Sequence, residues 1–462
     1  MPAIRIATWY LVCFFISSLS LPIFAQTRTL RVVAYNIEAD VNTYTGPLPG
    51  LIAPPNSTNN VQAGGVLEGI GEETAGPDPA QPIDVLALEE TTSNLSTVAP
   101  IVNGLNAFYG VPGMYASSSY QAKTTGGTGG GPNAMVFNTL TVQLLASTPV
   151  DPAGGSSKLG SKSGELREVV RYEFAPAGVA PAPANEFYIY VSHYKASPGS
   201  ANVAERLGEA QIIRTNEADD LPATARVLYV GDYNVDDSGE AGYQTILAAT
   251  SPNGIAQGQG VDPLNVTNNT GIAWGSTTTD TNILVILTEH SYDLEYRDDL
   301  QVMTTNVYYG APGGFKYVNG TYHAFGNNGT TAYYGTVNSG SNTALNNSQL
   351  VTNGPVFLSA SQIYLDLTDA SDHLPVVVDY TIPMPAPGIS GFSLAGNNLT
   401  LSVTNGITNE VYALLMQTNM AAPLKSWTVL ATNTASGGVF TFTATNVVDA
   451  SALDRFYILK GK

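Results

Sequence analysis

Short apolar runs rich in β-branched and aromatic residues recur along the chain and predict β-strands. Helical spacing of apolar residues predicts helices near Val66–Glu73, over Leu95–Leu105 and over Ala201–Asp220. The abundance of Gly, Asn, Thr, Ser and Tyr agrees with a strand-rich, loop-rich protein. The predicted strands before residue 383 are Leu30–Ile37, Ile83–Leu88, Ala134–Phe137, Val142–Leu145, Val169–Phe174, Phe187–Ser192, Arg226–Val230, Leu300–Met303 and Val376–Ile382.

Polar residues that a core does not need stand beside these runs. Singly they mean little, because an acid after a strand is usually a turn residue and a lone histidine is usually a structural one. Their ordered combination predicts reactive groups at a sheet edge, where a rigid scaffold can hold them in place. The residues are Asn36, Glu89 and Glu90, His193, Asp232 and Asn234 after Gly231, and Asp372 and His373.

In this order the motifs resemble those of the endonuclease/exonuclease/phosphatase superfamily. The resemblance covers about Leu30 to Ile382 and implies a four-layer α/β sandwich, in which two mixed β-sheets pack face to face with helices outside. Glu89 stands where the family more often has Gln. The matching segments are AYNIE with Asn36, DVLALEE with Glu90, SHYKAS with His193, GDYN with Asp232 and Asn234, RDDL with Asp299, and SDHLPV with Asp372 and His373.

The resemblance implies a metal-dependent hydrolase of phosphoric esters. Its metal ligands would be Asn36, Glu90 and Asp372, whose oxygens suit Mg²⁺ or Mn²⁺. Asp232 would orient or deprotonate the attacking water, and Asn234 would donate to a phosphoryl oxygen.

The resemblance also implies roles for two histidines. Asp299 would hold His373 in one tautomer, so that His373 acts as a base or as a donor to the phosphate. His193 would contact the opposite phosphoryl oxygen or assist the leaving group. Three basic residues are candidate phosphate contacts, whereas Arg206 is expected to form an ion pair on a helix surface. The three are Arg167, Arg171 and Lys195.

Residues 1–25 have the features of a secretory signal peptide. Arg5 supplies a positive start, Trp9–Ile16 is apolar, and cleavage after Ala25 would leave Gln26 first. An uncleaved membrane anchor is the alternative. The only cysteine, Cys13, lies in this segment, so the mature chain would contain none. We therefore expect a secreted, cell-surface or periplasmic protein that does not stay inserted in a membrane.

The charge of the chain limits its partners. There are 37 Asp and Glu against 18 Lys and Arg, and loss of Arg5 changes the net charge from −19 to −20. Such a chain lacks the basic surface of a tight nucleic-acid binder, so extracellular DNA or RNA would bind weakly. A phosphomonoesterase, a sphingomyelinase-like phospholipase, and a non-catalytic surface or adhesion protein are the alternatives. A phospholipase would be expected to present an exposed aromatic hairpin, but the Tyr-rich segment near residues 305–335 is better interpreted as a structural cluster. We expect a monomer.

Composition divides the mature chain into a catalytic domain, 26–382, a Pro-rich linker, 383–388, and a β module, 389–462. Within the first, residues 305–350 read as a long insertion or surface meander. The module is expected to be a small β-sandwich with a structural, attachment or sorting role. Its predicted strands are Leu399–Val403, Val411–Leu415, Trp427–Leu430, Val439–Phe442 and Phe456–Leu459.

Overall fold

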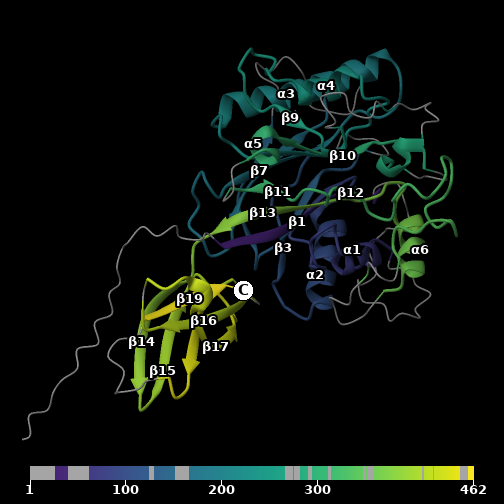
Figure 1. The fold of residues 1–462 in the computed structure, drawn as a ribbon. Coiled ribbons are helices and arrows are strands. Elements are labelled where there is room, and N and C mark those ends of the chain that lie inside the picture. The colour runs from purple at the N-terminus through teal and green to yellow at the C-terminus, as the bar shows by residue number, and fades with distance from the viewer. Residues whose placement is uncertain are drawn as a thin grey trace, which may run out of the picture.

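Two large β-sheets form the centre of the molecule in a computed structural model of the chain (Figure 1). The predicted signal segment, residues 1–25, lies outside the described residues. Among the residues that are described, no helix is long and apolar enough to cross a bilayer. The structure describes residues 26–39, 62–123, 130–150, 166–265, 274, 281–289, 294–310, 314–346, 350, 358–407, 410–419, 421–447 and 456–461.

The first sheet has the strand order β11-β13-β1-β2-β4-β3, with β12 also paired to β13. Its central strand β1 is parallel to β2 and antiparallel to β13, so the sheet is mixed. The strands are β1 (Gln26–Asn36), β2 (Val85–Glu89), β3 (Tyr115–Ser117), β4 (Ala134–Asn138), β11 (Lys316–Tyr317), β12 (His323–Ala324) and β13 (Val376–Met384).

The second sheet has the order β5-β6-β7-β8-β10-β9 and is also mixed, because β7 and β8 are parallel and its other pairs are antiparallel. Its strands are β5 (Val142–Val150), β6 (Val169–Pro176), β7 (Phe187–His193), β8 (Val227–Asp232), β9 (Gly260–Val261) and β10 (Asp299–Thr304).

Successive side chains of a strand point to opposite faces of its sheet, and in both sheets apolar side chains are buried on both faces. In β1, Val32 and Ala34 belong to the core between the sheets, whereas Val33 and Tyr35 belong to the core under the helices. Helices α1, α2 and α6 cover the first sheet, and α3 and α4 cover the second (Figure 1). The predicted four-layer sandwich is confirmed. The helices are α1 (Gln62–Glu72), α2 (Ala99–Phe108), α3 (Ser200–Asp220), α4 (Ala241–Leu247), the short α5 (Thr305–Tyr308) and α6 (Ala360–Ala370).

Residues 314–325 are part of the sheet domain, so for this part of the segment 305–350 the prediction of a surface insertion is wrong. Strands β11 and β12 both pair with β13. Phe315 and Phe325 are fully buried, and Tyr317 and Tyr322 are almost so. These four aromatic residues are structural, whereas Tyr309 and Tyr334 are exposed, at 66% and 54%. The two short strands could not be recognised from the sequence, because interspersed Gly and Asn interrupt the spacing of the buried residues.

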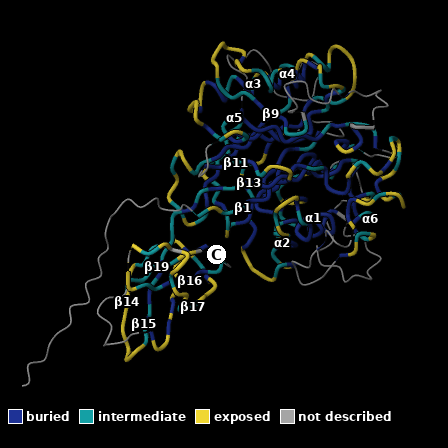
Figure 2. Tube along the Cα trace, in the orientation of Figure 1, coloured by how far each residue is buried: buried dark blue, intermediate teal, exposed yellow. Residues whose placement is uncertain are grey.

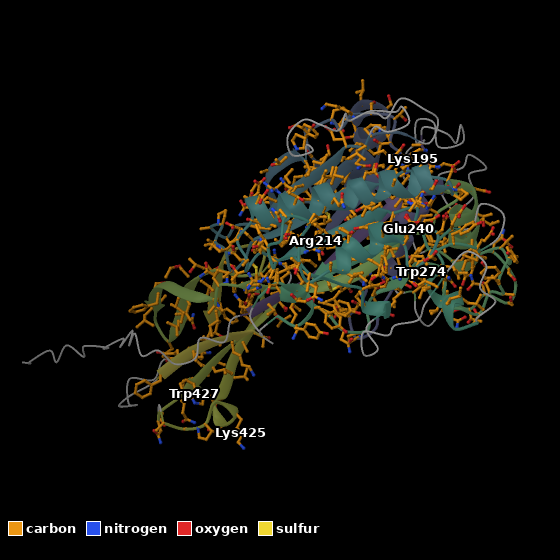
Figure 3. All side chains as sticks on the ribbon, turned by 90° about the horizontal axis from the view of Figure 1, so that it is seen from above. Lys195, Arg214, Glu240, Trp274, Lys425 and Trp427 are labelled. Carbon is orange, nitrogen blue, oxygen red and sulfur yellow. The ribbon has the colours of Figure 1, made fainter. Side chains whose placement is uncertain are left out.

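The C-terminal module consists of two three-stranded sheets that enclose their own apolar core (Figure 2). The five predicted strands are present, and a sixth, β14, was missed because its sequence, GISGFSLA, contains two glycines and is largely exposed. Figure 3 labels Lys425 and Trp427 in this module. Its strands are β14 (Gly388–Ala395), β15 (Asn398–Thr404), β16 (Val411–Gln417), β17 (Thr428–Thr434), β18 (Val439–Ala444) and β19 (Phe456–Gly461).

Candidate active site

Strand register brings most of the sequence-predicted residues together. Asn36, the last residue of β1, lies beside Glu89, the last residue of β2. In the second sheet, Asp232 at the end of β8 lies between His193 of β7 and Asp299 of β10. The carboxyl ends of both parallel pairs therefore contribute to one site between the sheets.

A glycine permits the close approach of β7 and β8 at this site. Gly231 precedes Asp232 and has φ +125°, a backbone conformation that residues with a Cβ rarely adopt. A Cβ there would lie 2.0 Å from the carbonyl oxygen of Ser192 and 2.8 Å from Glu89 Oε1. The glycine of the GDYN segment is thus required by the packing beneath the site.

Three buried side chains form a group that could hold a metal ion: Glu90, His193 and Asp232, whose ligand atoms all lie within 4.8 Å of one another. His193 Nε2 is 3.4 Å from both Glu90 Oε1 and Asp232 Oδ2. Asn36 Nδ2 donates to the same two oxygens at 3.1 Å, and its Oδ1 accepts from the backbone N–H of Glu38 at 3.0 Å. Two carboxylates and an imidazole suit a divalent cation.

The last motif supplies a second histidine beside this group. His373 Nδ1 is 2.7 Å from Asp299 Oδ2, and its Nε2 is 3.9 Å from Asp232 Oδ2. Asp372, predicted as a metal ligand, is outside the group above; its Oδ1 lies 3.6 Å from His373 Nε2. Ser371 anchors the motif, because its hydroxyl donates to the carbonyl oxygen of Asn36 at 2.7 Å.

The two histidines have opposite electrostatic surroundings. Burial, reinforced by the charge of Arg167, lowers the pKa of His193 well below its usual value. Burial also opposes protonation of His373, but the carboxylates of Asp299 and Asp232 outweigh it and raise its pKa well above the usual value. These directions favour the neutral ring of His193 and the protonated ring of His373, which can donate from Nε2.

Acidic side chains crowd the site. Burial raises the pKa of Asp232 to about 6 and that of Glu89 well above its usual value. Neither carboxylate oxygen of Glu89 has a hydrogen-bond partner, and Asp299 Oδ1 has none either. Buried, unpaired acid oxygens at this density are costly unless a proton or a cation compensates them. The site therefore fits a cation.

Sequence reasoning missed two further acids at the site. Glu289 forms an isolated β-bridge with His373, and burial raises its pKa to about 7. Asp298, next to Asp299, has its pKa raised well above the usual value by burial and then by the charge of Asp232. The adjacent acids of RDDL gave a signal for Asp298, whereas no motif marked Glu289.

The basic candidates separate into two places. Arg167 Nη1 donates to the carbonyl oxygen of Tyr194 at 2.7 Å. Lys195 follows His193 by two residues, and its Nζ donates to the carbonyl oxygen of Ala196 at 3.3 Å. The backbone of Lys195 and the guanidinium of Arg167 therefore lie next to the end of β7. Arg171 does not join them, because its guanidinium binds Asn216 at 2.8 Å and Asp220 at 3.2 Å.

Two other residues make contacts that the sequence did not predict. Arg206 does form an ion pair, with Glu240 at 2.6 Å, but its side chain is fully buried, so its predicted place on a helix surface is wrong. The side chain of Asn234 donates to Tyr194 O at 3.2 Å, while its backbone N–H donates to Asp232 Oδ1 at 2.9 Å. Asn234 therefore fixes the orientation of Asp232.

No family model matches the sequence, and no curated protein matches it. Solved structures do resemble it, with TM-scores below 0.5. The human Nocturnin catalytic domain with bound sulfate has 13% identity and a TM-score of 0.42, covering 77% of this chain and 97% of its own. An endonuclease/exonuclease/phosphatase from Beutenbergia cavernae has 13% identity and a TM-score of 0.40, covering 94% and 100%. An endonuclease/exonuclease/phosphatase from Bacteroides vulgatus has 14% identity and a TM-score of 0.42, and the match covers 77% of this chain and 99% of that protein. The solved structures that resemble this chain thus include proteins of the endonuclease/exonuclease/phosphatase family.

Proposed function

We propose that the chain is an exported, divalent-metal-dependent phosphoesterase of the endonuclease/exonuclease/phosphatase type, and that phosphodiesters are its substrates. The observation that carries this proposal is one buried site, built from both sheets, that joins Glu90, His193 and Asp232 to the Asp299–His373 pair. A non-catalytic adhesion protein has no use for so many buried charged groups, since each lowers stability unless it is compensated.

In this proposal Glu90 and Asp232 hold Mg²⁺ or Mn²⁺, with Asn36 between their carboxylates. When bound, such an ion supplies positive charge to the phosphoryl oxygens and makes a water molecule more acidic. Asp232 orients the attacking water, because Asn234 fixes one of its carboxylate oxygens and leaves the other in the site. His373, held by Asp299, donates from Nε2 to the phosphoryl group.

Substrate choice follows from charge. Arg167 and Lys195 provide positive charge at one side of the site, and the rest of the chain is acidic. Extracellular DNA or RNA would therefore bind weakly, and the enzyme would act as a non-processive nuclease. Phosphomonoesters and choline phospholipids are the comparison substrates.

The test is release of product from plasmid DNA, bis(4-nitrophenyl) phosphate, 4-nitrophenyl phosphate and sphingomyelin, each with Mg²⁺, Mn²⁺ or EDTA. We expect diester hydrolysis that EDTA abolishes. Glu90→Gln and His373→Ala should each reduce the rate by about 100-fold or more, in the range found for loss of one transition-state group. Hydrolysis that survives EDTA, or wild-type rates in both variants, contradicts the proposal.

A further inference from the structure

Helix α3 buries charged side chains where most helices bury apolar ones. Five of its eight buried residues are charged. Buried charges lower stability by several kcal/mol unless they are paired or hydrogen-bonded. Each must therefore be held by a partner, and the partners show what the helix does. The five are Glu205, Arg206, Glu209, Arg214 and Glu217.

The C-terminal half of α3 binds a loop that lies far from the site. Arg214 Nη1 donates to the carbonyl oxygens of Thr245 and Ala248, at 2.8 and 2.9 Å. Glu217 Oε1 accepts from Gln257 Nε2 at 3.0 Å. Figure 3 shows Arg214 apart from Lys195. These contacts support the fold around α4 and β9.

The N-terminal half of α3 holds the backbone at the site. Glu209 is fully buried; its Oε1 accepts from the backbone N–H of Arg167 at 2.8 Å and its Oε2 from that of Lys195 at 3.0 Å. Arg206 Nη1 donates to the carbonyl oxygens of Lys195 and Ser197, at 2.8 and 3.0 Å. One carboxylate thus links two segments 28 residues apart, just before β6 and just after β7.

We propose that Glu209 is a positioning residue for the substrate phosphate, because its carboxylate fixes the separation of Arg167 and Lys195 so that both cations flank one phosphoryl group. This inference rests on the proposed function. Arg206 holds the Lys195 backbone independently of Glu209, so loss of Glu209 should release mainly the Arg167 side. Arg167 Nη1 donates to the carbonyl oxygen of Tyr194, the residue between His193 and Lys195, so both cations belong to the backbone next to His193.

The experiment compares Glu209→Gln with Glu217→Gln, a buried acid two turns further along the same helix. Glutamine keeps the size of the side chain but offers only one acceptor oxygen, so Glu209→Gln loses one of the two backbone bonds. The measurements are kcat and KM for bis(4-nitrophenyl) phosphate with Mn²⁺, the inhibition constant of inorganic phosphate, and the melting temperature.

We expect Glu209→Gln to raise KM and the phosphate inhibition constant by about tenfold, as loss of one charge-assisted hydrogen bond would, with kcat within about threefold. Glu217→Gln should leave all three kinetic constants unchanged. Equal KM and inhibition constants in the two variants would overturn the inference while the proposed function stands. A wild-type chain that hydrolyses no phosphoester would refute the proposed function itself.

A double-mutant cycle separates positioning from general support of the fold. Because loss of Glu209 should act mainly through Arg167, the combined effect of Glu209→Gln and Arg167→Ala on phosphate inhibition is expected to be smaller than the sum of the single effects. Additive effects would contradict the inference. Arg167→Ala and Lys195→Ala keep Glu209 in place, so their inhibition constants test the two cations even if the Glu209 variant does not fold. Wild-type inhibition constants in both Arg167→Ala and Lys195→Ala would also contradict the inference.

Discussion

Replacing Glu90 by glutamine should remove most of the stabilisation that Mn²⁺ gives to the folded chain. Glutamine keeps the shape of the side chain and removes one of the negative charges that face the candidate cation position. A ligand that binds the folded state at 100 times its Kd stabilises it by about 2.7 kcal/mol. The experiment therefore measures metal binding without relying on catalysis.

The size of the effect follows from the size of the sheet domain. Unfolding entropy is about 2.1 cal/mol/K per residue, so roughly 350 residues give about 0.7 kcal/mol/K. Mn²⁺ at 100 times the wild-type Kd should then raise the melting temperature by about 4 °C. If Glu90→Gln weakens binding by about 100-fold, the same Mn²⁺ concentration equals the new Kd and contributes about 0.4 kcal/mol, or less than about 1 °C.

The assay is a thermal melt of the wild type, Glu90→Gln and Glu217→Gln, with Mn²⁺ or with NaCl at equal ionic strength. Glu217→Gln should keep the wild-type increment, because Glu217 is buried elsewhere on α3 and bonds Gln257. An increment in Glu90→Gln equal to that of the wild type would refute the cation site. An equal increment from NaCl would show that only ionic strength acts.

Three further predictions concern charged groups outside the metal group. Arg31 binds both carboxylate oxygens of Asp379 at 2.9 Å in full burial, so Arg31→Met should lower the free energy of unfolding by roughly 3–5 kcal/mol in urea titrations. Arg171→Met removes a partly exposed pair and should cost about 0–1 kcal/mol, with diester hydrolysis within about twofold of wild type. Burial lowers the pKa of His323, but Glu73 at 2.7 Å outweighs burial and raises it. The stabilisation from the His323–Glu73 pair is fully present below the pKa of histidine in the unfolded chain, and it is lost as pH rises through the pKa of His323 in the folded chain. The loss of stability caused by His323→Gln should therefore be larger at pH 5.5 than at pH 9. A loss that grows with pH would contradict the pairing of His323 with Glu73.

Much of the site could be predicted because its chemistry is local in sequence. Asn36, His193 and Asp232 each end an apolar run, and a strand that ends at a sheet edge exposes its last side chain to the site. The order of these motifs also implied the fold. Such residues can be found without knowing which strands pair.

The parts that were missed depend on contacts between distant segments. Glu289 reaches the site only because it bridges to His373, 84 residues later, and no local pattern records that pairing. Arg206 was predicted to lie on a surface because a charged residue in a helix is usually exposed. Its partner Glu240 is the residue just before α4, and this pairing between two helices allows Arg206 to be buried. Burial of a charge is decided by its partners, which sequence spacing does not show.

The pairing of β1 with β13 affects how the chain can fold. These neighbouring strands are joined in register from Gln26–Met384 to Ala34–Val376, so the first and last strands of the sheet domain lie side by side. A chain that is still being synthesised cannot form this pair until residues near 384 have appeared. Contacts at such sequence separation slow folding. The architecture thus favours a sheet domain that completes its folding only after residues near 384 have been synthesised.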